Sequence, residues 1–510
     1  MNENLARLEE AASAQLGPAV HHSDRRAPLP DEETPNPTDA GNALRFARHN
    51  REAVRWCPQW KVWLVWDGKR WAKDTQARVM QYAKQTARSI LDEARHTDDD
   101  ERRRKLTAWA ATSENVKRLQ AMLELAKSED GLSVEPNELN RDTWLLNVRN
   151  GTIDLRTGTL LPHDRARLIT KLVPIDYDAT AACPLWRTFL TRILNRDDEL
   201  LGFLQVAFGY SMTGSVRERV IFLLHGKGKN GKTTLVNVLL LLAGDEEYGI
   251  PTPSETLLAS RRDGGVRNDL ARFAGVRVVA AMESDQGRKL APALIKQLTG
   301  GDPIPARFLF GEFFTINPTW KIWFSTNHRP AIDDHGDAIW DRVKLIPFGV
   351  CIPDHEQDKQ LFTKLTAELP GILAWAVQGC LRWQRDGLGC PAAVRVATET
   401  YRQDENVFNH FLSERCVCEP QAMVKFADLR AAYVMWVEEA ADRPMTSKAF
   451  AAALQERGFT PIRSGNARHY VGVRLRGVTD DVADAQRARD EALHATEEPI
   501  SLFEEAPDAT

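Results

Sequence analysis

The stretch from Arg219 to Thr234 decides the fold and reads RVIFLLHGKGKNGKTT. Its apolar half, Val220 to Leu224, is short and rich in branched side chains, which predicts a buried strand. A glycine-rich turn follows, and the apolar run from Leu235 to Leu242 then predicts a helix. Such a turn aims successive backbone N–H groups at one anion, beside the positive end of the helix dipole. The stretch therefore predicts a site for a nucleoside triphosphate.

The spacing Gly226-x-x-x-x-Gly231-Lys232-Thr233 gives a chemical role to the side chains of this turn. The Lys232 ammonium is expected to contact the β- and γ-phosphates of ATP, and the Thr233 hydroxyl to bind Mg²⁺. Backbone N–H groups along the loop are expected to hold other phosphate oxygens. The predicted phosphate cradle consists of Gly226, Lys227, Gly228, Lys229, Asn230, Gly231, Lys232, Thr233 and Thr234.

The composition is that of a large globular protein. The chain has 510 residues, room for about three domains, and its 43% hydrophobic and 27% charged residues are ordinary for a protein with a packed core. No apolar run reaches the length of a membrane span, and the N-terminus lacks the apolar core of a signal peptide. Seven cysteines without metal-ligand spacing indicate reduced thiols. We therefore expect a cytoplasmic protein.

Polar residues follow two further predicted strands. The apolar run from Val276 to Met282 ends at Glu283, two residues before Asp285. A carboxylate at a strand end can hold Mg²⁺ through water and polarise the attacking water, so Glu283, assisted by Asp285, is the expected acidic group. Asn327 follows the apolar strand that begins at Lys321, and its amide can orient the hydrolytic water or touch the γ-phosphate.

A lone arginine, Arg342, stands just before a strand pattern that ends at Phe348. This placement suits a cation that is offered to the nucleotide of a neighbouring subunit. The ordered motifs resemble a superfamily 3 helicase, and more closely the helicase half of phage and plasmid primase-helicases, which is related to the poxvirus primase-helicase NTPase. The motifs lie at 226–233, 283, 296–302, 321–327 and 340–348, and with the upstream stretches 66–71 and 146–158 the resemblance covers roughly residues 42–475.

The resemblance implies an α/β P-loop NTPase motor with an AAA+-like parallel sheet flanked by helices. It implies a homo-oligomeric ring, expected to be a hexamer, with ATP and Mg²⁺ between subunits. Catalysis is assigned to Lys232, Glu283, Asn327 as the sensor and Arg342 as an arginine finger supplied in trans. Metal binding is assigned to Thr233, Glu283 and Asp285. The expected source is a phage or prophage, acting in the cytoplasm of a bacterial host.

The resemblance also implies that a hairpin in the ring channel grips single-stranded DNA. The predicted hairpin runs from Arg307 to Ile316, and its tip reads Gly311-Glu312 where a basic pair is usual. Arg307 and Lys321, which flank the hairpin, are therefore the expected DNA contacts. Only about forty residues precede the first family-like domain, so priming is expected to come from a separate primase.

Residues 42–182 are expected to form an α+β helicase-associated domain. Trp60 to Trp66 alternates like a strand, and Asp67-Gly68 predicts a hairpin turn. Helical patterns rich in Arg and Lys follow, and a second hairpin turns at Asn150-Gly151. The tryptophans and arginines can stack on bases. The alternative, which we favour here, is that the tryptophans are half-buried sheet residues.

Residues 416–477 show two helix patterns, a glycine stop and a hairpin with alternating basic residues, which predicts a winged-helix module. Its expected contacts to DNA phosphates are Lys448, Arg463 and Arg468. The alternative is a winged helix that contacts protein, because a fold does not determine its function.

The tail, residues 478–510, contains ten acidic and two basic residues, so the rest of the chain is mildly basic although the net charge is −4. Its apolar residues Ile500, Leu502 and Phe503 resemble short peptides that dock into bacterial sliding clamps. We expect the tail to recruit a clamp or another host replication protein. The alternative is a solubilising tail with incidental apolar residues. Because so short a motif has low specificity, this alternative is favoured.

The expected organisation divides the chain into a leader, the helicase-associated domain, the motor, a helical lid or linker, the winged-helix module and the acidic tail. The corresponding ranges are 1–41, 42–182, 183–350, 351–415, 416–477 and 478–510. The expected function is that of an ATP-dependent helicase on single-stranded or forked DNA. The alternatives are an origin-binding loader with little unwinding, a primase-helicase with an unrecognised priming activity, and a scaffold with a degenerate motor.

Overall fold

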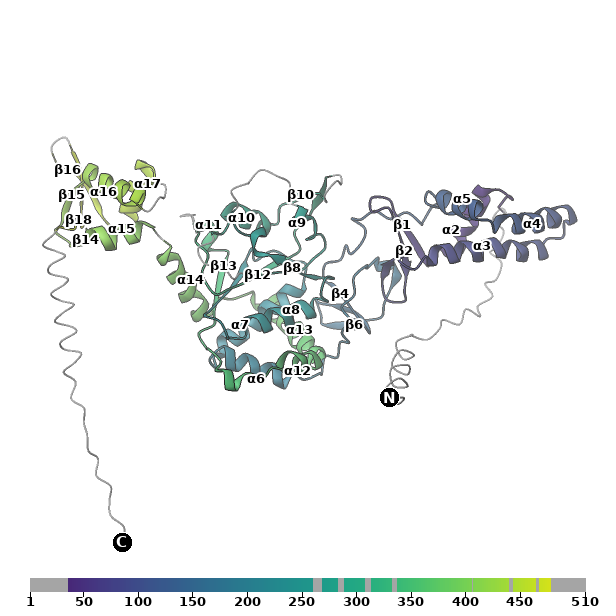
Figure 1. Cartoon of the computed structure of the whole chain (residues 1–510), viewed down its shortest axis with the longest axis horizontal. Helices are drawn as coiled ribbons and strands as arrows, with labels where there is room; N and C mark the ends of the chain where they lie inside the picture. Colours follow the sequence, from purple (N-terminus) through teal and green to yellow (C-terminus); the bar gives the residue numbers. More distant parts are fainter. Residues whose placement is uncertain are drawn as a thin grey trace, which may run out of the picture. The chain divides into compact units, whose positions relative to one another are not determined.

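The structure is a computed structural model, and it describes most of the chain in two compact units, Met1–Leu139 and Asn140–Thr510 (Figure 1). The described residues are 35–259, 268–282, 289–307, 313–332, 337–405, 407–439, 444–464 and 467–477. Most of the predicted leader and the whole acidic tail, with its Ile500, Leu502 and Phe503, lie outside these residues. Within the described part, every helix is too short or too polar to cross a membrane.

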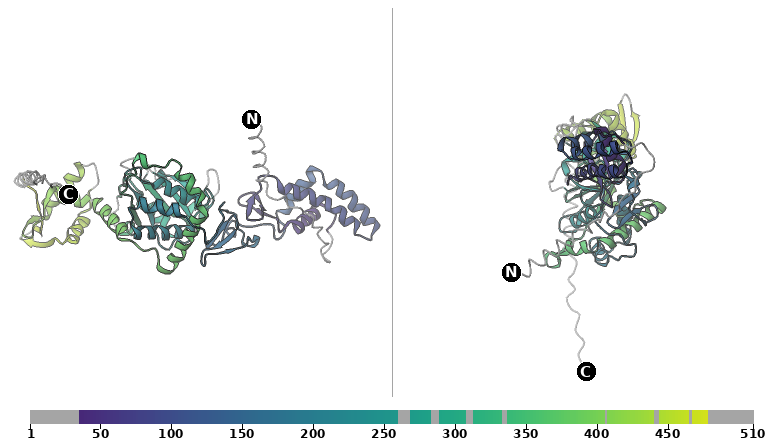
Figure 2. Two further views of the ribbon diagram at one scale, coloured as in Figure 1. Left: turned by 90° about the horizontal axis from the view of Figure 1, so that it is seen from below. Right: turned by 90° about the vertical axis from the view of Figure 1, so that its right-hand side faces the viewer.

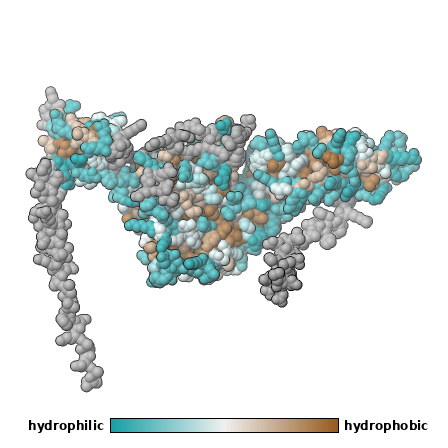
Figure 3. Space-filling model, in the orientation of Figure 1, coloured by the Kyte–Doolittle hydropathy of each residue, from teal (hydrophilic) through white to brown (hydrophobic). Residues whose placement is uncertain are grey.

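The first unit packs helices against the antiparallel sheet β1-β2-β3. Its elements are α2 (Asp39–Asn50), β1 (Val54–Cys57), β2 (Val62–Trp66), β3 (Trp71–Lys73), α3 (Arg78–Arg95), α4 (Asp100–Ser113) and α5 (Val116–Ala126). Trp71 is fully buried, and Trp63 meets the ring of Phe46 edge-on at 6.0 Å. These two tryptophans are therefore sheet residues that pack the core, as the favoured alternative predicts. The surface of this unit is largely hydrophilic in Figure 3, with scattered apolar side chains such as Val116.

The second unit begins with residues 140–182, which were predicted to belong to the helicase-associated domain over residues 42–182. They form the sheet β4 (Leu145–Val148), β5 (Gly151–Asp154) and β6 (Thr159–Leu161), followed by the short 3₁₀ helix η1 (Arg165–Arg167). Arg277, which is buried, donates to the Leu145 carbonyl oxygen at 2.6 Å and to the Met212 carbonyl oxygen at 2.7 Å. The expected boundary at residue 182 differs from the structure because such buried contacts and a shared apolar core join this sheet to the motor.

The centre of the second unit is a five-stranded parallel sheet in the order β13-β7-β12-β9-β8. Its strands are β7 (Ile221–His225), β8 (Gly249–Pro253), β9 (Val278–Met282), β12 (Lys321–Thr326) and β13 (Val343–Pro347). Alternate residues of β7, β9, β12 and β13 enter two different apolar cores: Phe222 lies in one and Leu223 in the other. A sheet that is buried on both faces needs near-continuous apolar strands, which explains the runs in the sequence.

Helices cover both faces of this sheet (Figure 2). One core contains side chains of α6 (Pro184–Ile193), α7 (Asp198–Met212), α8 (Lys232–Leu242) and α13 (Leu369–Asp386). The other contains side chains of α9 (Asn268–Ala271), α10 (Pro292–Gly300), α11 (Asp337–Trp340) and α14 (Ala392–Asp404). The predicted α/β class with a helix-flanked parallel sheet is confirmed.

The remaining elements of the motor are short. They are η2 (Ser254–Thr256), β10 (Ile304–Ala306), β11 (Phe314–Ile316), η3 (Asp354–Glu356) and α12 (Leu361–Ala367). β10 and β11 pair antiparallel, so the predicted hairpin is present around a tip that lies outside the described residues. Trp375 of α13 meets Trp186 edge-on at 5.8 Å and is 3% exposed. α13 is thus part of the main core, and the role of residues 351–415 as a helical lid or linker stays a prediction.

The C-terminal elements surround a separate aromatic core. They are α15 (Val407–Arg415), β14 (Cys416–Val417), β15 (Met423–Lys425), α16 (Phe426–Glu439), α17 (Ser447–Glu456), β16 (Thr460–Ser464), β17 (Ala467–Val471) and β18 (Arg474–Leu475). Phe408 and Phe411 of α15 belong to this core with Tyr433, Phe450 and Tyr470. The C-terminal module therefore includes α15, upstream of the expected start at residue 416. Two helices followed by a hairpin match the predicted order of elements, and the winged-helix assignment stays a prediction.

Candidate nucleotide site

The glycine-rich loop lies where the sequence predicts it, between the end of β7 at His225 and the start of α8 at Lys232. Gly231 precedes the helix with a φ of 81°, in the left-handed region that glycine adopts without strain. At Gly226 the backbone runs so close to the chain after β13 that an added Cβ would lie 2.2 Å from the Phe348 carbonyl oxygen. The backbone geometry therefore requires both glycines.

The Lys232 ammonium is buried at the centre of this loop. Lys232 is 4% exposed and donates to the Gly226 carbonyl oxygen at 2.6 Å and to the amide oxygens of Asn230 and Asn327 at 3.0 Å each. Burial lowers the pKa of Lys232 to about 8, because the charged form loses hydration there. All three acceptors are uncharged, so an incoming phosphate can compete with them for the ammonium.

Asn327, the predicted sensor, reaches the loop from the neighbouring strand. β12 pairs in parallel with β7, with Thr326 opposite His225, so the two strands end at the same edge of the sheet. The Asn327 amide oxygen accepts from the Gly228 backbone N–H at 3.3 Å as well as from Lys232. The structure therefore brings together the predicted lysine and the predicted sensor.

The chain after β13, residues 348–354, also lies along the loop, and the sequence analysis missed it. The Ile352 N–H donates to the Lys229 carbonyl oxygen at 2.8 Å, and the Lys229 ammonium donates to the Asp354 carboxylate at 2.6 Å. This hydrogen bond raises the pKa of Lys229 and lowers the pKa of Asp354. Only the strand order, which places β13 beside β7, reveals this neighbour.

The predicted acidic pair, Glu283 and Asp285, lies outside the described residues. β9 ends at Met282, which is paired with Ser325, two residues before Asn327. The strand that precedes the acidic pair therefore ends at the same edge of the sheet as the loop. The roles of Glu283 and Asp285 stay predictions. Thr233, the predicted Mg²⁺ ligand of the loop, is exposed in the first turn of α8.

Arg342, the predicted arginine finger, lies at the opposite edge of the sheet. It precedes β13, whose first residue Val343 is paired with Ile221 at the start of β7. The five residues of β7 span about 16 Å at about 3.3 Å per residue, and the loop follows the far end. The Arg342 guanidinium donates to the Thr299 hydroxyl at 3.1 Å and to the Ala338 carbonyl oxygen. The arginine therefore lies far from the phosphate loop of its own chain.

Lys321, a predicted DNA contact, is buried in the structure, which does not favour that role. The side chain is 1% exposed, and its ammonium donates to the carbonyl oxygens of Thr213, Ser215 and Thr319. Burial lowers the pKa of Lys321 well below its usual value. Thr213 caps the C-terminus of α7, where backbone carbonyls lack helical partners and the helix dipole favours a cation. The sequence showed a lysine beside a hairpin and could not show that it caps a distant helix.

The other expected DNA contacts are exposed. Arg307 lies after β10 with its guanidinium 4.9 Å from the centre of the Phe313 ring, which is 58% exposed. In the C-terminal module Lys448 is exposed near the start of α17, and Arg463 and Arg468 face each other across the β16–β17 hairpin. Like charges directly opposite each other on a hairpin are destabilising. A bound polyanion would relieve the repulsion between these two arginines.

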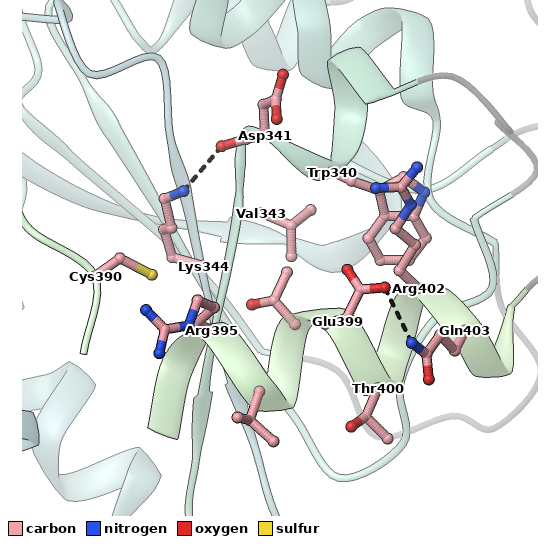
Figure 4. A pocket seen from close by; sticks show the side chains of 12 residues that line it. Trp340, Asp341, Val343, Lys344, Cys390, Arg395, Glu399, Thr400, Arg402 and Gln403 are labelled. Carbon is pink, nitrogen blue, oxygen red and sulfur yellow. Dashed lines mark hydrogen bonds between the residues drawn. The ribbon is translucent and has the colours of Figure 1, made fainter. Parts of the chain in front are cut away.

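A groove of about 620 Å³ lies away from the loop, between the edge strand β13 and α14 (Figure 4). On the β13 side of the groove Lys344 donates to the Asp341 carbonyl oxygen at 3.0 Å, and on α14 Gln403 donates to Glu399 at 3.1 Å. Trp340, Arg395 and Arg402 are also among its lining residues. The groove contains none of the predicted phosphate-binding residues.

Comparison with known proteins supports the resemblance that the motifs predict. Residues 43–195 match the family model described as "D5 N terminal like". The chain is 26% identical to "Putative helicase L207/L206" of Acanthamoeba polyphaga mimivirus, over 56% of this chain and 32% of that protein. It is also 26% identical to "Putative helicase 022R" of Frog virus 3, over 44% of this chain and 25% of that protein.

A third relative bears a different name. "Putative primase C962R" of African swine fever virus is 22% identical over 58% of this chain and 34% of that protein. The matched part of the chain thus spans about a third or less of these curated relatives. The apo structure of the NrS-1 C terminal region has a TM-score of 0.47 over 87% of this chain and all of that one, with 8% identity. The predicted resemblance is confirmed to this extent: the chain is similar to viral proteins named as helicases and primases, and part of it matches the family model.

Proposed function

We propose that the chain is the motor of an ATP-dependent DNA helicase or translocase that acts in phage or prophage replication. The observation that carries this proposal is the buried Lys232 ammonium, held by the loop and by Asn327. Its three neutral acceptors keep the cation in place before nucleotide arrives. Phosphate oxygens then take over its hydrogen bonds, and the Asn327 amide is released to orient the attacking water.

The loop backbone and the first turn of α8 bind the phosphates in this proposal. N–H groups and the positive end of the helix dipole point toward the anion. The Thr233 hydroxyl, together with Glu283 and Asp285, would hold Mg²⁺, whose charge neutralises the phosphates when it is bound. The exposed position of Thr233 at the start of α8 fits this role. Glu283 is also the proposed acceptor of the proton from the attacking water.

The site is completed by a second copy of the chain in a homo-oligomeric ring, proposed as a hexamer. The position of Arg342, at the edge of the sheet opposite to the loop of its own chain, supports delivery of the arginine in trans. An arginine finger contributes about 10³–10⁵ in rate where its removal is measured in other NTPases. Hydrolysis would then require the oligomer, because each site takes its loop from one subunit and its arginine from the neighbouring subunit.

The substrate in this proposal is single-stranded or forked DNA. Arg307 beside the exposed Phe313 ring offers a cation and a stacking surface, which single strands bind without sequence preference. The C-terminal module, proposed to be a winged helix, would contact phosphates through Lys448, Arg463 and Arg468. A separate primase, and a clamp or other replication protein at the acidic tail, are the proposed partners.

A subunit-mixing experiment tests the shared site. Lys232→Ala and Arg342→Ala proteins are each expected to lose ATP hydrolysis, measured with single-stranded DNA present. A mixture of the two is expected to regain part of the activity, because some interfaces then pair an intact loop with an intact arginine. A mixture as inactive as its components, or an Arg342→Ala protein with normal turnover, would contradict delivery in trans.

A primase-helicase is the second candidate, because one relative is named as a primase. Primer synthesis on an unpaired template, assayed with wild-type protein and Lys232→Ala, separates the two. Ribonucleotide primers made by both proteins would favour the second candidate. DNA-stimulated ATP hydrolysis without primers or unwinding would favour an origin-loading role instead.

A further inference from the structure

The loop that carries the candidate sensor is held by the last turn of α14. This sensor loop, residues 327–332, follows β12. Its Arg329 guanidinium is 2.8 Å from the Asp404 carboxylate, and the Tyr401 hydroxyl donates to the Pro330 carbonyl oxygen. The Glu405 carboxylate accepts from the Ile332 N–H at 3.0 Å. Three residues of the loop, Arg329, Pro330 and Ile332, are thus bonded to the C-terminal end of one helix.

Two of these three bonds involve buried residues, whereas the Arg329–Asp404 pair is partly exposed. Tyr401 is fully buried and Ile332 is 2% exposed, so their hydrogen bonds are shielded from water. The Arg329 guanidinium also lies 5.3 Å from the centre of the Tyr401 ring. Separating a buried polar group from its hydrogen-bond partner costs free energy. The sensor loop and the helix turn are therefore expected to move together.

The same tyrosine also touches the element that precedes the candidate arginine finger. Its ring meets the ring of Trp340 edge-on, with centres 5.0 Å apart and planes at 86°. Trp340 ends α11, two residues before Arg342. Higher on the helix, the Thr398 hydroxyl accepts from the Leu345 N–H at 3.1 Å on the edge strand β13. α14 therefore contacts segments next to both halves of the proposed shared site, the sensor loop and the residues around Arg342.

The same end of α14 leads directly into the C-terminal module. α14 ends at Asp404 and α15 begins at Val407. The His410 ring nitrogen Nε2 lies 2.5 Å from the Asp404 carbonyl oxygen, which in the tautomer protonated at Nε2 is a hydrogen bond between the two helices. Phe408, on the same turn of α15, is 1% exposed in the aromatic core of the module. Asp404 thus bonds to the sensor loop through its side chain and to α15 through its backbone.

We propose that α14 is a coupling helix, and that Tyr401, Asp404 and Glu405 are positioning residues that link the nucleotide state at Asn327 to DNA binding by the C-terminal module. This inference rests on the proposed function. When phosphate takes the Lys232 ammonium from Asn327, the sensor loop shifts and carries the last turn of α14 with it. By thermodynamic linkage, DNA that favours one position of α14 changes the handling of ATP by the same free energy.

The surroundings of α14 leave room for such a shift. The groove between this helix and β13 runs along its exposed side, with Glu399 and Arg395 on the helix and Lys344 on the strand (Figure 4). A helix that borders open space on one side displaces fewer packed side chains when it tilts than a helix enclosed by a dense core. The helix is thereby suited to two positions.

Two conservative variants and one matched control test the proposal. Tyr401→Phe removes the bond to Pro330 and keeps the ring against Trp340, and Asp404→Asn weakens the pairing with Arg329. Glu399→Gln changes a carboxylate on the groove side of the same helix. For each, ATP hydrolysis is measured with and without an unpaired oligonucleotide, together with KM for ATP and the thermal unfolding midpoint.

We expect the stimulation by DNA to fall at least about fivefold in Tyr401→Phe and Asp404→Asn, with KM for ATP and hydrolysis without DNA within about twofold of wild type. Glu399→Gln is expected to keep full stimulation. Normal stimulation in both α14 variants would overturn the proposal, as would an equal loss with and without DNA, which a merely structural role produces. A wild-type protein that hydrolyses no ATP would instead refute the proposed function.

Discussion

Replacing Lys321 by methionine removes a buried cation and keeps a side chain of similar length. The Thr213 carbonyl oxygen, which is fully buried, loses its donor, and an unsatisfied buried acceptor costs about 1–3 kcal/mol. The carbonyls of Ser215 and Thr319 are in half-buried residues, where water can replace the donor. Loss of a cation at the end of α7 adds up to about 2 kcal/mol, and relief of the buried charge offsets part of the sum. We expect a net loss of about 2 kcal/mol.

The assay is urea unfolding of wild type and Lys321→Met, followed by tryptophan fluorescence and circular dichroism at two pH values. Burial lowers the pKa of Lys321 from 10.5 in the folded protein, so the unfolded state binds more protons between the folded pKa and 10.5. Stability from this group therefore rises with pH across that window, and the deficit of Lys321→Met is expected to be larger at pH 9 than at pH 7.

Lys344→Met is the matched control. Lys344 is a half-buried lysine on β13, in the same sheet as Lys321, and its ammonium donates a hydrogen bond to the Asp341 carbonyl oxygen. Its stability is expected to stay within about 0.5 kcal/mol of wild type. DNA affinity of folded Lys321→Met is expected to match wild type. A variant with wild-type stability and lost DNA affinity would show that Lys321 contacts DNA and would refute the assignment to the end of α7.

Three further predictions concern the nucleotide and the DNA. Burial lowers the pKa of Lys232 to about 8, and only the protonated form donates fully to phosphate, so ATP affinity is expected to fall by up to about tenfold per pH unit above pH 8, and far less in Lys232→Arg. Asp354→Asn frees the exposed Lys229 ammonium and is expected to raise ATP affinity about threefold at low salt, with the gain fading as ionic strength rises. Arg463→Ser is expected to weaken DNA binding and to reduce the slope of log affinity against log salt by about 1, without loss of stability, because Arg463 faces Arg468. Unchanged pH dependence, ATP affinity or salt slope would contradict each in turn.

The sequence predicted the core of the motor because its signals are local. The strand predicted from Val220 to Leu224 is β7, which is shifted by one residue and runs from Ile221 to His225. The predicted helix is α8, which begins at Lys232, within the glycine motif. A buried parallel strand and a helix dipole each leave a mark in a short window of residues. Asn327 was expected near the γ-phosphate because it follows a predicted strand, and its hydrogen bond to Lys232 agrees with that expectation.

The failures come from contacts between residues distant in sequence. Lys321 and the carbonyl of Thr213 are separated by 108 residues, and no periodicity relates a strand start to a helix end. The pairing of Lys229 with Asp354 depends on the strand order, which a single sequence does not display. The strand pattern in residues 140–182 does not show which domain these strands pack against. Only their buried contacts, such as that of Arg277 with Leu145, assign them to the motor.

The central claim is that ATP bound at Lys232 drives movement on DNA. The most direct test is unwinding of a forked DNA duplex by wild-type protein and by Lys232→Ala, measured alongside ATP hydrolysis with and without single-stranded DNA. We predict unwinding that requires ATP, hydrolysis that single-stranded DNA stimulates, and loss of both in Lys232→Ala while the protein stays folded. Unwinding or hydrolysis that survives in Lys232→Ala would contradict the claim.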